Sequence, residues 1–94
     1  MGDPTPANVD VVPNAVAEGA TTDVMAWLTG FNDGEEITVT VVAEDGSETT
    51  YSATAGANRA AMVAIDPSGL EAGFYSVIAE GDQGGTASAG LQVK

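Results

Sequence analysis

The 94-residue chain contains no cysteine and no histidine. Without cysteine no disulfide can form, and without either residue the usual ligands of zinc, haem and iron–sulfur clusters are missing. Nucleophiles that depend on a histidine base are excluded for the same reason. These absences remove most classes of hydrolase and metalloenzyme, so we expect neither catalytic activity nor a cofactor.

Basic residues are nearly absent, because Arg59 and Lys94 stand against fourteen acidic residues and the net charge is −12. Such a surface repels phosphate backbones and anionic membranes, so we expect no nucleic-acid partner and no membrane partner. The acidic residues are spread over the loops, which favours a general role in solubility. Docking onto a basic partner is the alternative.

Long apolar runs are also missing, and none approaches the roughly 20 residues of a membrane-spanning helix. The first residues have neither the basic region nor the apolar stretch of a secretory signal. Aromatic residues make up only 5% of the chain, and alanine and valine supply much of its 44% apolar content. This composition predicts a thin core between two closely packed sheets in a single domain.

Pro4 and Pro6 lie in a start that has no large apolar residue apart from Met1. Residues 1–8 are therefore expected to form an extended arm, and residues 9–94 the domain. Pro13 is expected to end the first strand, or to direct the chain across to the other sheet.

Short segments that alternate apolar and polar residues predict strands at residues 9–12, 22–29, 36–44, 48–54, 59–65, 73–80 and 86–93. Asp45-Gly46 predicts a two-residue hairpin turn with positive φ at both positions. Seven or eight short strands indicate an all-β fold, an immunoglobulin-like antiparallel β-sandwich with Greek-key connections. The residues expected on the inner faces are Ile37, Val39, Val41, Val63, Ile65, Tyr75, Val77, Leu91 and Val93.

Tyr75 stands where a strand begins after a proline- and glycine-containing turn. Greek-key sandwiches often carry a tyrosine at such a corner, and its hydroxyl bonds back to nearby backbone. We therefore predict that Tyr75 is buried and that its hydroxyl bonds to backbone near residues 67–70.

Two stretches of the chain match the pattern of a known family. The first is Gly30-Phe31-Asn32-Asp33-Gly34-Glu35, followed by Ile37 and Val39; the second consists of Pro67, Gly73, Tyr75, Val77 and Ala79. From about Val9 to Val93 the chain resembles the immunoglobulin-like repeats, of E-set or TIG type, of bacterial and archaeal surface proteins and of tailed-phage virion accessory proteins. The resemblance implies a spacer, an adhesive module or a coat decoration, with no catalytic residues.

Two oxygen-rich loops could suggest calcium, with Asp33, Glu35 and Asp45 as candidate ligands. Neither loop has the spacing of an EF-hand. An acidic residue beside glycine is more simply explained by a turn, so the turn interpretation is favoured.

The strand at residues 22–29 has large apolar residues in both phases. If Val24, Ala26 and Leu28 face the core, then Met25 and Trp27 point outwards. Met62 is likewise out of phase on a strand expected to lie beside this one. These three residues would then form an apolar patch of the kind that marks contact surfaces. Trp27 pointing into the core is the equally favoured alternative.

The leading hypothesis is a virion accessory protein that decorates the capsid of a tailed phage or related virus. Its partners would be capsid or neighbouring structural subunits, with self-association on the lattice as an option. The contacts would come from the arm, with Pro4 and Pro6, and from Met25, Trp27 and Met62. The alternative is a spacer or adhesion module of a secreted or cell-surface protein. A carbohydrate-binding module is less favoured because aromatic residues are few.

Overall fold

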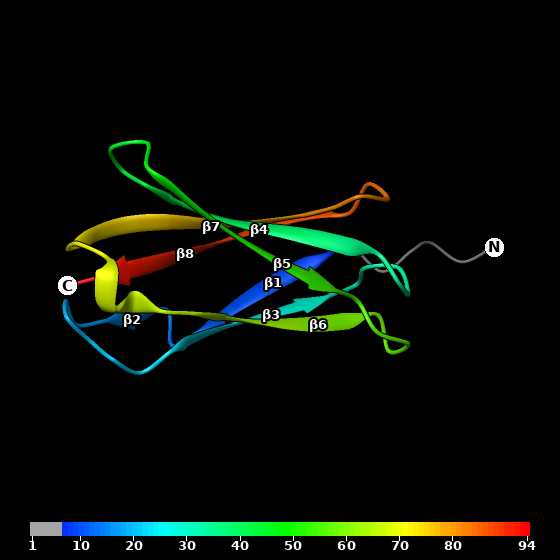
Figure 1. Cartoon of the computed structure of the whole chain (residues 1–94), viewed down its shortest axis with the longest axis horizontal. Helices are drawn as coiled ribbons and strands as arrows, with labels where there is room; N and C mark the ends of the chain where they lie inside the picture. Colours follow the sequence, from blue (N-terminus) through cyan, green and yellow to red (C-terminus); the bar gives the residue numbers. More distant parts are fainter. Residues whose placement is uncertain (1–6) are drawn as a thin grey trace.

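Strands with apolar residues at every second position form two β-sheets that pack face to face (Figure 1). The computed structural model describes residues 7–94. One sheet has the order β1-β3-β6 and consists of β1 (Asn8–Val12), β3 (Val24–Thr29) and β6 (Ala60–Ile65). The other has the order β2-β8-β7-β4-β5 and consists of β2 (Ala15–Val16), β4 (Glu36–Ala43), β5 (Glu48–Thr54), β7 (Gly73–Gly81) and β8 (Thr86–Val93). The predicted all-β sandwich is confirmed.

Connections between the strands mostly cross from one sheet to the other. Only β4–β5 and β7–β8 are hairpins within a sheet. The chain leaves the three-stranded sheet at Pro13, which follows a cis peptide bond, and enters the five-stranded sheet as β2. The pairing of β2 with β8 is parallel, so the sandwich is not antiparallel throughout.

The core lies between the sheets and contains all nine residues predicted for the inner faces. Val24, Ala26 and Leu28 are completely buried there, so Met25 and Trp27 are on the outer side of β3. A 3₁₀ turn, η1 (Pro67–Gly69), covers the core with Pro67 before β7 begins. No helix in residues 7–94 is long and apolar enough to cross a membrane.

The hairpin between β4 and β5 differs from the predicted two-residue turn. Ala43 N–H donates to Ser47 O at 2.8 Å and Gly46 N–H donates to Ala43 O at 3.0 Å, which closes a three-residue loop at positions 44–46. Gly46 has a φ of 90°, whereas Asp45 does not have a positive φ. A type I turn followed by one left-handed residue has this geometry. The Asp45 side chain favours it by accepting from Ser47 N–H at 2.9 Å.

The described chain begins and ends at opposite ends of the sandwich (Figure 1). β1 begins at Asn8, the last residue of the predicted arm, and Asn8 pairs with Thr29. Ala7 is half-buried and packs against the core. Pro4 and Pro6 lie outside the described residues. Lys94 bonds through its backbone to Val16 and Glu18 at the other end.

Candidate interaction surface

The outer side of the three-stranded sheet carries two rows of side chains that run across its strands. In the first row Asp10 pairs with Trp27, and Trp27 pairs with Met62. In the second row Val12 pairs with Met25, and Met25 pairs with Ala64. We call these six residues the outer patch. Because neighbouring strands are about 4.8 Å apart, paired side chains in a row are in reach of one another.

Large apolar side chains in the outer patch are exposed to solvent. Trp27 is 48% exposed, and Val12 and Met62 are each 50% exposed. Of the two orientations left open for Trp27, the outward one is therefore observed. The predicted pairing of β3 with β6 places Met62 beside Trp27. Whether Met25, Trp27 and Met62 contact a partner remains a prediction.

The outer side of the five-stranded sheet is different in character. Threonine, serine and glutamate occupy most of its outward positions, for example Thr38, Thr50, Ser76 and Glu80. Phe74 is 63% exposed near one end of β7. Exposed apolar side chains are thus concentrated on the three-stranded sheet.

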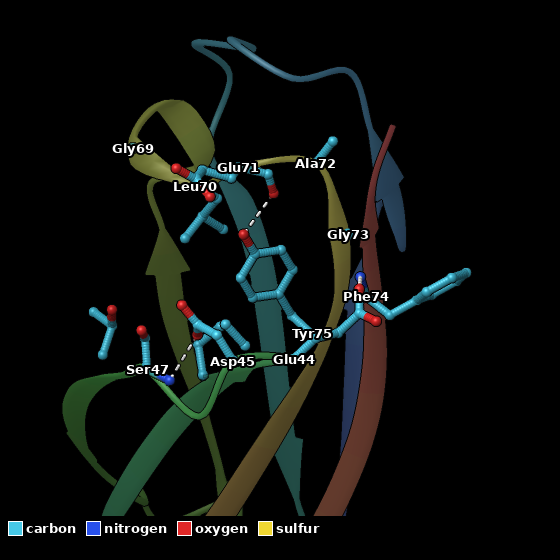
Figure 2. Close-up of a pocket in the computed structure, with 13 residues that line it drawn as sticks. Glu44, Asp45, Ser47, Gly69, Leu70, Glu71, Ala72, Gly73, Phe74 and Tyr75 are labelled. Carbon is cyan, nitrogen blue, oxygen red and sulfur yellow. Dashed lines mark hydrogen bonds between the residues drawn. The ribbon is translucent and has the colours of Figure 1, made fainter.

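A cleft of about 390 Å³ opens at the end of the sandwich where the described chain ends (Figure 2). The β4–β5 hairpin forms one of its walls and residues 69–75 form the other. Two acidic side chains of the cleft bond to the chain's own backbone: Glu44 Oε1 accepts from Phe74 N–H at 2.9 Å, and Asp45 accepts from Ser47 N–H. These carboxylates therefore hold the loops that form the cleft.

Tyr75 reaches into this cleft from β7 and its hydroxyl donates to Glu71 O at 2.5 Å (Figure 2). The acceptor lies one residue beyond the stretch 67–70 where we expected it. Burial raises the pKa of the Tyr75 hydroxyl, and the negative charge of Glu71 adds to this effect. The hydroxyl is thus a neutral donor that fixes the corner between η1 and β7.

Glu35 occupies the opposite end of the sandwich and is only 1% exposed. Its Oε1 accepts from Asn32 N–H at 2.8 Å, and its Oε2 accepts from Gln83 N–H at 3.1 Å and Gly85 N–H at 3.3 Å. The bond from Asn32 is the main reason that the pKa of Glu35 is lowered, while burial opposes the shift. This carboxylate joins the β3–β4 loop to the β7–β8 turn.

Gly81 and Gly85 make room for these buried groups. A Cβ at Gly81 would overlap Glu35 Oε2, and a Cβ at Gly85 would come within 2.9 Å of the Phe31 ring. Sequence reasoning missed the burial of Glu35. The available signals were its place between Gly34 and a predicted strand and its position in the stretch of residues 30–35 that matches the family pattern.

The three calcium candidates do not come together. Asp33 is exposed in the loop before Glu35, whereas Asp45 lies beyond the far end of the eight-residue β4, roughly 25 Å away. Within residues 7–94, no group of three or more acidic side chains is arranged to hold a metal ion. The Asp45 carboxylate accepts from Ser47 N–H within its own turn, as the turn interpretation predicts, whereas Glu35 accepts two of its three bonds from the distant β7–β8 turn.

Arg59, one of the two basic residues, forms hydrogen bonds at the same end of the sandwich as Glu35. Its φ of 64° is the one positive value at a non-glycine residue between residues 7 and 94. Its Nε donates to Phe31 O at 3.1 Å, and Phe31 N–H donates to Arg59 O at 3.3 Å. The side-chain bond is suited to hold the backbone in a conformation that is costly for arginine.

Two solved structures are similar to this chain in fold. The chain is similar to a tetra-tandem repeat in the extending region of a large adhesion protein, with a TM-score of 0.64 and 23% identity. The match covers 95% of this chain and 24% of that chain, so this chain spans about a quarter of it. The CARDB domain of a Pyrococcus furiosus protein, solved in complex with di-metal ions, has a TM-score of 0.57 and 11% identity over 94% of this chain and 90% of that chain.

No protein-family model and no curated protein matches the chain. Both structural likenesses establish an immunoglobulin-like fold for the chain, and neither described structure comes from a virion. The prediction of a capsid-decorating protein is therefore without support from these comparisons.

Proposed function

We propose that this chain is an immunoglobulin-like repeat module of a secreted or cell-surface protein, in which it acts as a non-enzymatic spacer or adhesion unit. The observation that carries the proposal is the path of the chain. β1 starts at the end of the sandwich that contains Glu35, and Lys94 leaves at the end that contains Tyr75 (Figure 1). Copies joined through these two ends would form an extended row, because each would enter and leave along its long axis.

The likeness to the adhesion protein supports this reading of the fold. Its solved chain consists of four tandem repeats, and the present chain matches 24% of it while covering 95% of its own length. One copy of the present domain therefore corresponds in size to one repeat of that array. This favours the surface-module hypothesis over capsid decoration.

Two surface properties fit a module of this kind. Two of the carboxylates that line the cleft at the Tyr75 end, those of Glu44 and Asp45, accept from backbone N–H groups, which leaves them poorly placed for acid–base chemistry. The net charge of −12 would keep neighbouring modules apart and soluble. We expect purified protein to show no hydrolase activity.

The test uses the native protein in the cells that produce it. An antibody against this domain should detect a polypeptide much larger than 94 residues. Brief protease treatment of intact cells should release fragments that carry the epitope, while a cytoplasmic marker stays intact. A species of this chain's own size that sediments with virus particles would instead support capsid decoration and contradict the proposal.

Linked copies test the head-to-tail geometry separately. Each added copy should lengthen the particle by roughly 30–40 Å in solution scattering, which is the length of a nine-residue strand with its turns. A particle that grows in thickness instead of length would contradict an extended array.

A further inference from the structure

We propose that the outer patch binds a basic side chain of a partner protein, with Trp27 as the stacking surface and Asp10 as the counter-ion. The inference goes beyond the spacer role and does not depend on where the module stands in a longer protein. Its basis is the first row of the outer patch, in which Asp10, Trp27 and Met62 lie next to one another on three paired strands.

The geometry of this row suits an arginine or lysine side chain. Trp27 has an exposed ring because its neighbours in β3, Ala26 and Leu28, supply the core contacts of the strand. A cation is attracted to the face of an indole ring, more strongly than to phenylalanine or tyrosine. Asp10 stands opposite Trp27 in the register and is exposed. A cation on Trp27 would therefore have a carboxylate within reach.

The second row supplies an apolar surface for the rest of the partner. Val12, Met25 and Ala64 continue the outer patch along the strands. Methionine side chains adapt to different shapes, and they are enriched with tryptophan at protein interfaces. A sugar-binding surface would depend more on aromatic rings, and Trp27 is the one aromatic residue of β1, β3 and β6. These observations favour a protein partner.

The charge around the outer patch favours a basic partner over a second copy of this chain. Asp23 immediately precedes β3 and Asp66 immediately follows β6, and both are exposed. Because Val24 pairs with Ile65, these two acids flank the same end of the sheet. A second copy would bring a further −12 charge, and its Arg59 already donates to Phe31 O. Like charges facing one another across an interface oppose association.

The test measures the affinity of two labelled peptides by fluorescence anisotropy. One peptide alternates arginine with valine, and the matched peptide carries neutral citrulline in place of each arginine. The protein should bind the arginine peptide, and citrulline should reduce the affinity about tenfold or more. The chain contains a single tryptophan, so quenching of its fluorescence reports contact with the outer patch alone.

Four variants locate the binding site. Trp27→Ala should weaken the arginine peptide about tenfold or more, as truncation of an aromatic anchor does. Asp10→Asn should weaken it several-fold and reduce its salt dependence. The matched controls are Asp33→Asn, which removes an exposed acid at the end of the sandwich near Glu35, and Phe74→Ala, which removes an exposed ring from the other sheet; both should bind as the unaltered protein does. Unchanged melting temperatures would show that all four fold.

Several results would overturn the proposal. An equal loss for Asp33→Asn and Asp10→Asn would mean that the peptide senses only the general acidic field. Equal binding of the citrulline peptide would remove the requirement for a cation. Dimerisation that depends on Trp27 in sedimentation experiments would identify a second copy as the occupant. Quenching of Trp27 by a soluble oligosaccharide, without a response to the arginine peptide, would identify a carbohydrate surface.

Discussion

Each end of the sandwich has a buried side chain that bonds to backbone, Tyr75 at one end and Glu35 at the other, and the bonds of these two side chains span very different distances in sequence. At one end the Tyr75 hydroxyl donates to Glu71 O, four residues away. At the other end the Glu35 carboxylate accepts from Gln83 and Gly85, which are 48 and 50 residues away, as well as from nearby Asn32. The first contact shapes a corner within one connection, whereas the second holds separate connections together.

The number of bonds also differs between these two side chains. Glu35 accepts three backbone bonds in a nearly solvent-free site, and Arg59 links the adjoining β5–β6 turn to Phe31. Tyr75 makes one bond at the wall of an open cleft. We therefore expect loss of the Glu35 carboxylate to destabilise the domain more than loss of the Tyr75 hydroxyl.

The largest expected effect follows Glu35→Ala. This change leaves three backbone donors without their acceptor in a site that water enters poorly. Each unpaired buried donor lowers the stability of the fold by its full desolvation penalty. The drop in melting temperature should be several times that of Tyr75→Phe. Glu36→Ala, which removes an exposed carboxylate from the adjacent residue, is the control and should change the melting temperature little. Equal effects at positions 35 and 36 would contradict the role of the buried bonds.

The same carboxylate should give the stability a specific dependence on pH. The pKa of Glu35 lies below its ordinary value of 4.5 in the folded protein, so its contribution is complete above that value and is lost as the pH falls through the lowered pKa. The difference in unfolding free energy between the unaltered protein and Glu35→Gln should be constant near neutral pH. It should shrink as the pH falls below 4.5 and through the lowered pKa, because the protonated side chain resembles glutamine. Other carboxyl groups are common to both proteins and cancel. A difference that does not vary with pH would show that folding leaves the pKa of Glu35 unchanged.

Tyr75→Phe should have a smaller effect at the opposite end. It removes one hydroxyl and one hydrogen bond, which is worth about 0.5–1.5 kcal/mol in unfolding free energy. The melting temperature should fall by about 4–8 °C per kcal/mol in a domain of this size. Chemical denaturation gives the free energy directly. No measurable loss would mean that the bond to Glu71 does not stabilise this corner.

The sequence predicts the Tyr75 end better than the Glu35 end, because the partners of Tyr75 are near in sequence and most partners of Glu35 are far away. The corner at Tyr75 was predictable because η1, Glu71 and Tyr75 form one continuous stretch with a known turn pattern. The acceptor was misplaced by one residue, since no pattern distinguishes neighbouring carbonyl groups. Glu35 was read as a loop acid because its partners, Gln83 and Gly85, are far away in sequence.

The sheets themselves were predictable because period-two alternation marks an inner face, and all nine expected residues lie in the core. The phase of β3 was not, since it carries large apolar residues at both even and odd positions. Packing decides it: Val24, Ala26 and Leu28 fit the thin space between the sheets, and Trp27 is left outside. The outer patch therefore became visible only with the pairing of β1, β3 and β6.

Arg59 offers a finer comparison at the end near Glu35. Arg59→Ala loses the bond to Phe31 O and keeps a non-glycine residue at a positive φ. Arg59→Gly loses the same bond but removes the conformational strain, because glycine adopts a positive φ at no steric cost. Arg59→Ala should be less stable than Arg59→Gly by about 1 kcal/mol. Arg59→Gly itself should differ from the unaltered protein by less than about 1 kcal/mol, because relief and lost bond offset one another. Denaturant titration of the three proteins checks this order, and an alanine variant as stable as the glycine variant would contradict it.

The smallest expected effect is that of calcium. A calcium ion needs six to eight oxygen ligands, and the oxygens of Glu35 already accept three N–H bonds. Asp33 and Asp45 stand near opposite ends of β4 and cannot share an ion. Millimolar calcium should therefore leave the melting temperature unchanged beyond the effect of magnesium at the same concentration, which controls for general screening of the acidic surface. A rise specific to calcium that disappears in Asp33→Asn would show a site at the end near Glu35, and one that disappears in Asp45→Asn would show a site at the cleft.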